Sequence, residues 1–363
     1  MRLYTLSTGD IVYRYYKSIV INFGQPRKVL STSVQNGGYR EDLTAVFNHD
    51  CNPGAGMACT LRAPTYEEHL RLVSGELGID PNTVSGIATA ANMKNVSIQA
   101  EDYENLTVTA LVTGGVEVNG GRIGDPATYF KPNEENKIEK PGTINIMLVL
   151  DADMPPGILA RAMVTCTEAK TAALQELMVG SNYSQGLATG SGTDGTIVIA
   201  NPSSSLYLES AGKHSKLGEL IGRVVKKAVK EALLKQTGLS PTVQHSVLRR
   251  GKRFGIQEEA LWQEYQQQST APVTKQQFLE SLYQLDTQQE LVTYTSLYFH
   301  LLDQLSWELL SEAEVVEAGN ELLLAVANKY NAAPSSIHGS GWKACAQAWS
   351  EVLVSILRKK YNC

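Results

Sequence analysis

Apolar residues recur along the first two thirds of the chain at two spacings, and each spacing predicts a type of element. Runs rich in β-branched residues predict strands at 17–23, 28–34, 84–91, 106–113, 143–150 and 195–200. Gly24-Gln25-Pro26 lies between the first two runs, and this spacing predicts that they form a β-hairpin. Polar and apolar residues alternate along 106–113 well enough to give the predicted strand one face that the rest of the protein covers.

Spacings of three and four residues predict helices between these strands. Thr65 and Glu68 form a capping box at the start of a helix that reaches Leu77. Pro155-Pro156 can open a second helix, to about Met178, and an apolar stripe over 217–233 predicts a third. Strands that alternate with helices in this way predict an α/β fold of layered sheet and helices.

The chain changes character near Gly238-Leu239-Ser240-Pro241, where a glycine and a proline can end the third helix. Residues 241–363 hold five of the 30 glycines and read as helices only. Their last helix carries Trp342, Trp349 and other apolar residues on one face, which is typical of a core-facing helix. We therefore expect two domains, residues 1–240 and an all-helical domain over residues 241–363.

Charge and composition narrow the functional classes. The chain has 363 residues, with 32 Lys and Arg against 37 Asp and Glu, a net charge of −5 that argues against nucleic-acid binding as the main task. Apolar runs such as Ile146 to Leu150 are far too short to span a membrane, and no secretory signal is expected. Five scattered cysteines without a CxxC pair predict neither a zinc ribbon nor a disulfide framework, and favour a cytoplasmic location.

Three polar, glycine-rich segments are not explained by local structure. They are 112–126, with five glycines between Gly114 and Gly124; 141–146, which leads into a strand; and 188–196, which precedes another strand. Glycines allow a backbone to approach a ligand closely and to adopt positive φ. The helix between the last two segments contains Thr167-Glu168-Ala169-Lys170 among small residues.

Together with Leu30-Ser31-Thr32, Asn36-Gly37-Gly38-Tyr39-Arg40 and Gly212-Lys213-His214-Ser215, these segments resemble the adenosylcobinamide amidohydrolases, the CbiZ family of corrinoid salvage. The resemblance covers about residues 17–237 and leaves the helical tail outside it. It implies hydrolysis of the amide between the aminopropanol arm and the corrin ring of adenosylcobinamide. The products would be adenosylcobyric acid, which re-enters coenzyme B12 synthesis, and aminopropanol.

The order of strand, helix and Gly/Ser/Thr/Asp loop also resembles the ornithine acetyltransferase and β-aminopeptidase group. Those enzymes are layered α/β proteins whose Ser or Thr nucleophile begins a strand after self-cleavage. Gly142-Thr143 falls at the corresponding place in this sequence. Thr143 is therefore a candidate nucleophile, although a β-branched residue that merely starts a strand is the plainer interpretation. We expect an uncut chain, since the CbiZ resemblance does not require cleavage.

Amide hydrolysis also needs a proton shuttle and donors to the developing oxyanion. Glu168, Asp194 and His214 are the candidates for acid–base work; a solvated helix face, a turn aspartate and a satisfied core histidine are their plainer interpretations. The candidates for substrate binding in these segments are polar residues or a glycine: Asn119, Gly120, Asp125, Asn145, Thr189, Ser191 and Thr193. His49, which lies elsewhere in the region of the resemblance, is a further candidate. Each of these types is also common in turns, at strand edges or, for histidine, in cores.

No metal-ligand spacing occurs, so the sequence predicts no protein-bound metal and no cofactor beyond the cobalt that the substrate itself carries. The expected partner is a corrinoid small molecule, with neither nucleic acid nor membrane, and oligomerisation is left open. Two alternatives remain: a corrinoid-binding protein without turnover, and a self-processing acyltransferase or peptidase.

Overall fold

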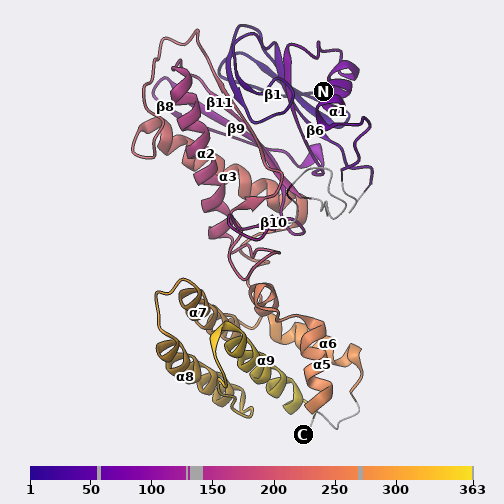
Figure 1. The fold of residues 1–363 in the computed structure, drawn as a ribbon, viewed down its shortest axis with the longest axis vertical. Helices are drawn as coiled ribbons and strands as arrows, with labels where there is room; N and C mark the ends of the chain where they lie inside the picture. The colour runs from indigo at the N-terminus through magenta and orange to yellow at the C-terminus, as the bar shows by residue number, and fades with distance from the viewer. Residues whose placement is uncertain (55–58, 128–129, 131–141, 269–272, 362–363) are drawn as a thin grey trace. The chain divides into compact units, whose positions relative to one another are not determined.

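The computed structural model describes residues 1–54, 59–127, 130, 142–268 and 273–361, which divide into two compact units. The first unit comprises residues 1–183 and 187–240, and the second comprises residues 184–186 and 241–363. The first is a layered α/β unit and the second is helical, as the sequence predicts. Figure 1 shows the chain from its indigo N-terminus to its yellow C-terminus.

Two sheets form the centre of the first unit. The five-stranded sheet has the order β1 (Arg2–Thr5), β2 (Ile11–Tyr15), β3 (Ser18–Asn22), β6 (Ala45–Asp50), β7 (Val84–Thr89). The six-stranded sheet has the order β5 (Gly38–Arg40), β4 (Lys28–Ser31), β13 (Gly195–Ala200), β11 (Thr143–Leu150), β9 (Leu106–Gly115), β8 (Ser97–Tyr103). A two-stranded ribbon pairs β10 (Gly120–Gly121) with β12 (Gly190–Ser191).

The two faces of the central strand β11 show how the sheets and helices are layered. On β11, Ile146 and Leu148 pack in the cluster that includes the helices, whereas Met147 and Val149 pack in a second cluster with residues of the other sheet. Successive side chains of a strand point to opposite faces, so one face of β11 meets the helices and the other meets the five-stranded sheet. The sheets therefore stack face to face, with helices on the outside.

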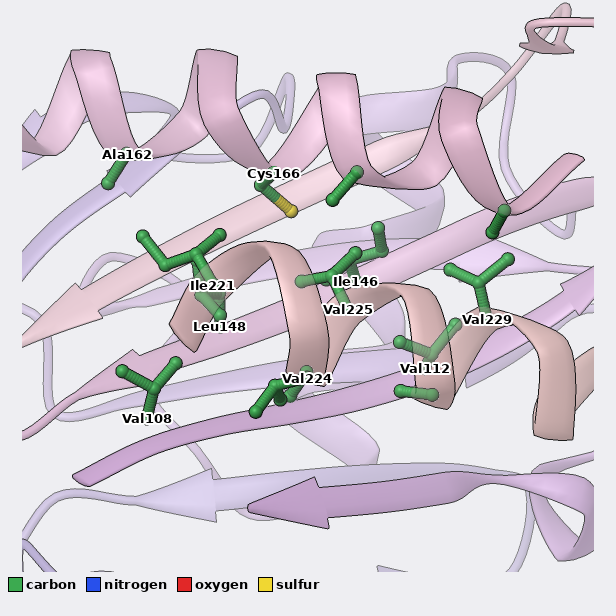
Figure 2. Packing of buried hydrophobic residues seen from close by; sticks show 14 of the residues in the cluster. Val108, Val112, Ile146, Leu148, Ala162, Cys166, Ile221, Val224, Val225 and Val229 are labelled. Carbon is green, nitrogen blue, oxygen red and sulfur yellow. The ribbon is translucent and has the colours of Figure 1, made fainter. Parts of the chain in front are cut away.

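The helices of the first unit cover both outer faces. α1 (Tyr66–Glu76) packs Leu70 and Val73 on the five-stranded sheet, and its predicted capping box is confirmed. α2 (Pro156–Glu176) and α3 (Lys216–Thr237) cover the six-stranded sheet. Figure 2 shows strand residues of this sheet meeting residues of α2 and α3: Val108, Val112, Ile146 and Leu148 on the strands, Ala162 and Cys166 on α2, and the stripe Ile221, Val224, Val225 and Val229 on α3. A single turn of 3-10 helix, η1 (Met93–Asn95), follows β7.

The second unit has a separate core. Its helices are α4 (Val247–Gly251), η2 (Lys252–Phe254), α5 (Glu258–Gln268), α6 (Lys275–Asp286), α7 (Gln289–Ser306), α8 (Glu312–Tyr330) and α9 (Gly341–Lys359). Trp349 of α9 is fully buried and stacks on Tyr298 of α7 with ring centroids 4.6 Å apart. The face predicted for the last helix is thus a core face. None of the helices that the structure describes is long and apolar enough to cross a membrane.

Two predictions from the sequence are wrong, one about the pairing of strands and one about the cysteines. The strands at 17–23 and 28–34 do not form a hairpin: β3 pairs with β2 and β6, while β4 pairs with β13 and β5 of the other sheet. The segment between them crosses from one sheet to the other, and a buried ion pair between Arg27 and Asp10 stabilises that crossing. The local turn residues fit a hairpin, but the hydrophobic layer between the sheets decides the pairing.

Cys51 and Cys59 form a disulfide, where the sequence predicts none. The spacing of eight residues is no recognised motif, and the pairing arises because the chain folds back after β6, with the Thr60 N–H donating to the Cys51 carbonyl at 3.2 Å. Cys166 and Cys345 are buried thiols, and burial raises the pKa of Cys166 to about 12. Cys363 lies outside the described residues.

Candidate active site

Thr143 begins β11 and is 5% exposed. Its place on the strand puts it on the same face as Asn145 and Met147, so its side chain belongs to the layer between the sheets. The Thr143 hydroxyl is hydrogen-bonded to the hydroxyl of Thr193, an exposed residue in the loop before β13. The candidate nucleophile therefore lies at the end of the inter-sheet layer, next to a loop that is open to solvent.

The carbonyl oxygen of Gly142 accepts two side-chain hydrogen bonds. Asn119 donates from Nδ2 at 3.0 Å and Thr193 donates from Oγ1 at 3.2 Å. Tyr183 donates its hydroxyl proton to Asn119 Oδ1 at 2.7 Å, which fixes the amide so that its nitrogen faces Gly142. Gly142 has a φ of +137°, and a Cβ on it would lie 2.9 Å from the Asn119 Cβ, so a glycine is needed here. Pro141 lies outside the described residues.

Asp194 connects the loop before β13 to β11 and α2. Its Oδ1 accepts hydrogen bonds from the Ile144 N–H at 2.8 Å and the Ser191 hydroxyl at 2.6 Å. Its Oδ2 accepts the Ser191 N–H at 3.1 Å and forms an ion pair with Lys170, in which both side chains are 11% exposed. A Cβ on Gly190 would lie 2.5 Å from Asp194 Oδ2, so the close approach depends on glycine. Asp194 therefore holds the backbone on the C-terminal side of Thr143.

The β10–β12 ribbon holds the neighbouring loop. Asp125 accepts hydrogen bonds from the Arg122 N–H at 2.7 Å and the Ser181 hydroxyl at 2.6 Å. Thr189 accepts the Ile123 N–H at 2.9 Å, and the pairing of Gly120 with Ser191 joins the loop to the one that carries Asp194. Asp125, Thr189 and Gly120 thus belong to the loop framework around the cluster.

Asn145 lies inside the layer rather than at its end. It is 1% exposed, donates from Nδ2 to the Asn48 side chain at 2.8 Å and to the Ala88 carbonyl at 3.0 Å, and accepts the Gly195 N–H at 3.0 Å. Asn48 in turn donates to the Thr113 hydroxyl at 2.8 Å. This polar bridge ties the two sheets together directly behind Thr143.

His214 and Glu168 are not brought to Thr143. The end of β9 at Gly115, which pairs with Thr143, lies beside Gln236 near the C-terminus of α3. His214 precedes the N-terminus of α3, so about 30 Å of helix separates the two places, at 1.5 Å per residue. Glu168 is on an exposed face of α2, with the nearest ion-pair atoms of Arg161 and Lys213 at 4.0 Å and 3.7 Å.

His49 faces away from the cluster. Its neighbour on β6, Asn48, points to the inter-sheet layer, so the His49 side chain points to the outer face of the sheet, towards α1. There its Nδ1 is hydrogen-bonded to the Ser18 hydroxyl at 2.8 Å. Burial lowers the pKa of His49 to about 4.

Sequence reasoning missed Lys170 and Tyr183. The signal for Lys170 was present, because it falls on the stripe of buried residues Cys166, Ala169 and Ala173, whereas Glu168 falls beside it. A charge on a buried stripe needs a partner, and here that partner is Asp194. Tyr183 carried no signal, since its loop has no periodicity. Among the described residues, no group of three His, Cys, Asp or Glu side chains lies close enough to hold a metal ion.

A hydroxyl on a strand end, with an amide and a second hydroxyl as donors beside it, is an arrangement suited to acyl transfer. The family match agrees with this class. Residues 3–241 match the model of the adenosylcobinamide amidohydrolase family (CbiZ), and the chain belongs to that family, which is a family of hydrolases. The match contains every residue of the cluster around Thr143.

Two curated relatives cover the same region. The chain is 35% identical over 231 residues to an uncharacterized protein of Methanocaldococcus jannaschii, covering 61% of this chain and 87% of that protein. It is 31% identical over 206 residues to an adenosylcobinamide amidohydrolase of Methanosarcina mazei, covering 54% of this chain and 86% of that protein. Among solved structures it is similar to a Burkholderia sp. β-aminopeptidase, with a TM-score of 0.32 and 11% identity over 60% of this chain and 79% of that one, too distant to bear on the reaction.

Proposed function

We propose that this protein hydrolyses the amide between the aminopropanol arm and the corrin ring of adenosylcobinamide. Water would add its hydroxyl to the acyl carbon and a proton to the departing nitrogen, giving adenosylcobyric acid and aminopropanol. The observation that carries the proposal is the family match over residues 3–241, which includes the cluster around Thr143. The proposal places the reaction in the salvage of cobinamide for coenzyme B12 synthesis.

In the proposed mechanism, the Thr143 hydroxyl attacks the amide carbonyl and forms an ester while the amine leaves with a proton; water then hydrolyses the ester. Asn119 has a second Nδ2 proton besides the one that it donates to the Gly142 carbonyl, so it can donate to the developing oxyanion. The single hydroxyl proton of Thr193 already goes to the Gly142 carbonyl, so Thr193 becomes a second donor only when it releases that oxygen. Lys170 and Asp194 act as positioning residues that hold the strand start.

The base that takes the Thr143 proton depends on whether the chain is cut. Of His49, His214, Glu168 and Asp194, only Asp194 lies beside Thr143, and four donors of Ile144, Ser191 and Lys170 already engage its oxygens. In a chain cut between residues 142 and 143, the free α-amine of Thr143 would serve as the base instead. A denaturing mass spectrum separates the two versions: the uncut chain that we expect has a mass of 39.5 kDa.

The decisive experiment is incubation of the purified protein with adenosylcobinamide, followed by mass analysis of the products. Adenosylcobyric acid and aminopropanol in equal amounts are expected, without added metal or cofactor. Tight binding with unchanged substrate would favour a corrinoid-binding protein, and turnover of acylated amino acids or β-peptides alone would favour the acyltransferase or peptidase alternative. Either result would reject the proposed reaction.

A cytoplasmic location belongs to the same proposal. Disulfides are typical of oxidising compartments and rare in most cytosolic proteins, so the Cys51–Cys59 pair bears directly on it. The test is to trap the thiols of the native source cells at lysis and count them by mass. Reduced Cys51 and Cys59 would agree with a reducing cytoplasm, and a complete disulfide would argue for an oxidising location.

A further inference from the structure

A cavity of about 510 Å³ lies on the outer face of the five-stranded sheet, beside α1. Its lining includes Ser18 and His49 from the sheet, His69 and Val73 from α1, and the disulfide at Cys51. Its volume is in the range of small-molecule sites. Because Asn48 and His49 face opposite sides of β6, the sheet separates this cavity from the layer that contains Thr143.

His69 supplies a buried hydrogen-bond donor that none of the described residues accepts. The Arg62 N–H donates to His69 Nδ1 at 3.1 Å, so the ring proton of the neutral imidazole is on Nε2. His69 is 1% exposed, and its Nε2 has no hydrogen-bond partner among the described residues. With its proton on Nε2, His69 presents a donor to a ligand and not a lone pair to a metal ion.

The charged groups that line the cavity are paired with one another. Arg62 and Glu76 form a two-pronged ion pair with both N···O distances at 2.8 Å, and Lys17 lies 4.0 Å from Asp50. Burial lowers the pKa of His69 and that of His49, so both imidazoles are neutral at pH 7. The lining therefore carries no net charge for a charged ligand to neutralise.

Two tyrosines border the cavity: Tyr15 at the end of β2, and Tyr16 on the turn between β2 and β3. Tyr16 is 100% exposed and has a φ of +46°, a backbone conformation that non-glycine residues rarely adopt. Tyr15 beside it is 39% exposed, and its ring already stacks on that of Tyr13 with the centroids 5.5 Å apart. A large aromatic ring left fully in water, on a strained backbone, makes no packing contribution to the fold. It is well placed to stack on a flat ligand at the cavity mouth.

We infer that this cavity binds an uncharged heteroaromatic molecule of nucleoside size, with a ring acceptor that accepts a hydrogen bond from His69 Nε2 and a flat face that stacks on Tyr16. An acceptor satisfies the buried donor, neutrality matches the paired charges, and the flat ring matches the exposed Tyr16 side chain. The inference concerns a site separate from the proposed catalytic cluster and does not depend on the proposed reaction.

Titration calorimetry of the full chain with adenosine tests the inference. Binding at a single site is expected, with adenosine 5′-monophosphate bound no more tightly than adenosine. Tyr16→Ala should weaken adenosine binding by roughly five-fold or more, the scale of one lost base–aromatic stack. The matched control is Tyr207→Ala, because Tyr207 is 55% exposed and does not line the cavity; it should leave the affinity unchanged.

His69→Phe keeps a ring of similar size and removes the donor, so it should also weaken binding. Thr143→Ala should have no effect on adenosine affinity, because its cluster is on the other side of the sheet. No detectable adenosine binding to the folded protein would overturn the inference. The inference would also be overturned if neither Tyr16→Ala nor His69→Phe lowered the affinity for adenosine. A preference of ten-fold or more for the charged monophosphate would have the same consequence.

Discussion

Thr143 can be tested by two substitutions that differ by one hydroxyl. Thr143→Ala should lower turnover by at least ~100-fold, the scale of a lost catalytic group. Thr143→Ser keeps the hydroxyl and should keep part of the activity. The measurement is the rate of aminopropanol release at saturating adenosylcobinamide. Near-normal turnover in Thr143→Ala would remove Thr143 from the mechanism and leave an activated water as the nucleophile.

His49 gives the first unit a predictable pH dependence. Its pKa is about 4 in the folded protein against 6.5 when free, so the unfolded chain binds the proton more readily. The contribution of His49 to the free energy of unfolding is therefore fully present above pH 6.5. It is lost as the pH falls towards 4, by up to roughly 3 kcal/mol. His49→Gln removes the titration and should make the decrease smaller.

The readout must come from the first unit itself. All four tryptophans, at 262, 307, 342 and 349, belong to the second unit, so their fluorescence does not follow the first. Backbone hydrogen exchange over Ala45–Asp50 at pH 7 and pH 4.5, corrected for the intrinsic pH effect, gives the local stability directly. Equal decreases in the parent and in His49→Gln would contradict the assignment to His49.

At the scale of elements, the start of β11 depends on the glycine before it. Gly142→Ala introduces a Cβ at a φ of +137° and 2.9 Å from the Asn119 Cβ, so the strand start must shift. We expect a loss of about 1–3 kcal/mol in stability and of ten-fold or more in turnover, because Thr143 and its donors move apart. Circular dichroism and the aminopropanol assay measure the two effects.

The control for that substitution is Gly222→Ala. Gly222 lies inside α3, with nothing within 4 Å of where a Cβ would be, so alanine should leave turnover unchanged and stabilise the helix by about 0.5–1 kcal/mol. If Gly142→Ala behaves like this control, the backbone at residue 142 is not what positions the candidate nucleophile.

Elements with a strong local pattern were predictable and their partners were not. The β-branched run at 143–150 and the capping box at Thr65 are local signals, and the structure confirms both. The pairing of β4 with β13, about 170 residues apart, leaves no local trace, so the hairpin prediction followed the turn residues instead. β6, an interior strand of its sheet, was missed because Asn48, His49 and Asp50 interrupt its apolar run.

The candidate site was predictable where its residues flank strands and not where they depend on the fold. Thr143, Asn119 and Asp194 come from three glycine-rich segments, and the sheet brings these segments together at one end. On α2, sequence reasoning selected Glu168, whereas the structure turns Lys170 inward to Asp194. To choose between Glu168 and Lys170, one must know which face of α2 is buried. That face is defined by the whole series of apolar residues along the helix and not by the two residues themselves.

For the whole molecule, the helical unit has its own core and lies outside the family match. A truncation to residues 1–240 should therefore stay folded and retain part of its turnover in the aminopropanol assay. Residues 184–186 group with the second unit, so the truncation also removes the partners of that loop. A truncation that is folded by circular dichroism but inactive would show that the tail completes the site.

The pairing of β4 with β13 also sets an order in which the protein can be made. β1 to β7 are complete once residue 89 has left the ribosome, but β4 and β5 have no sheet to join until residues 195–200 are synthesised. For that interval the inner face of the first sheet, with Ile21 and Val46, lacks the part of its cover that Ile197 and Ile199 of β13 supply. Nascent chains released before residue 195 should therefore bind a hydrophobic dye and a holdase chaperone, whereas chains released at residue 240 should bind neither.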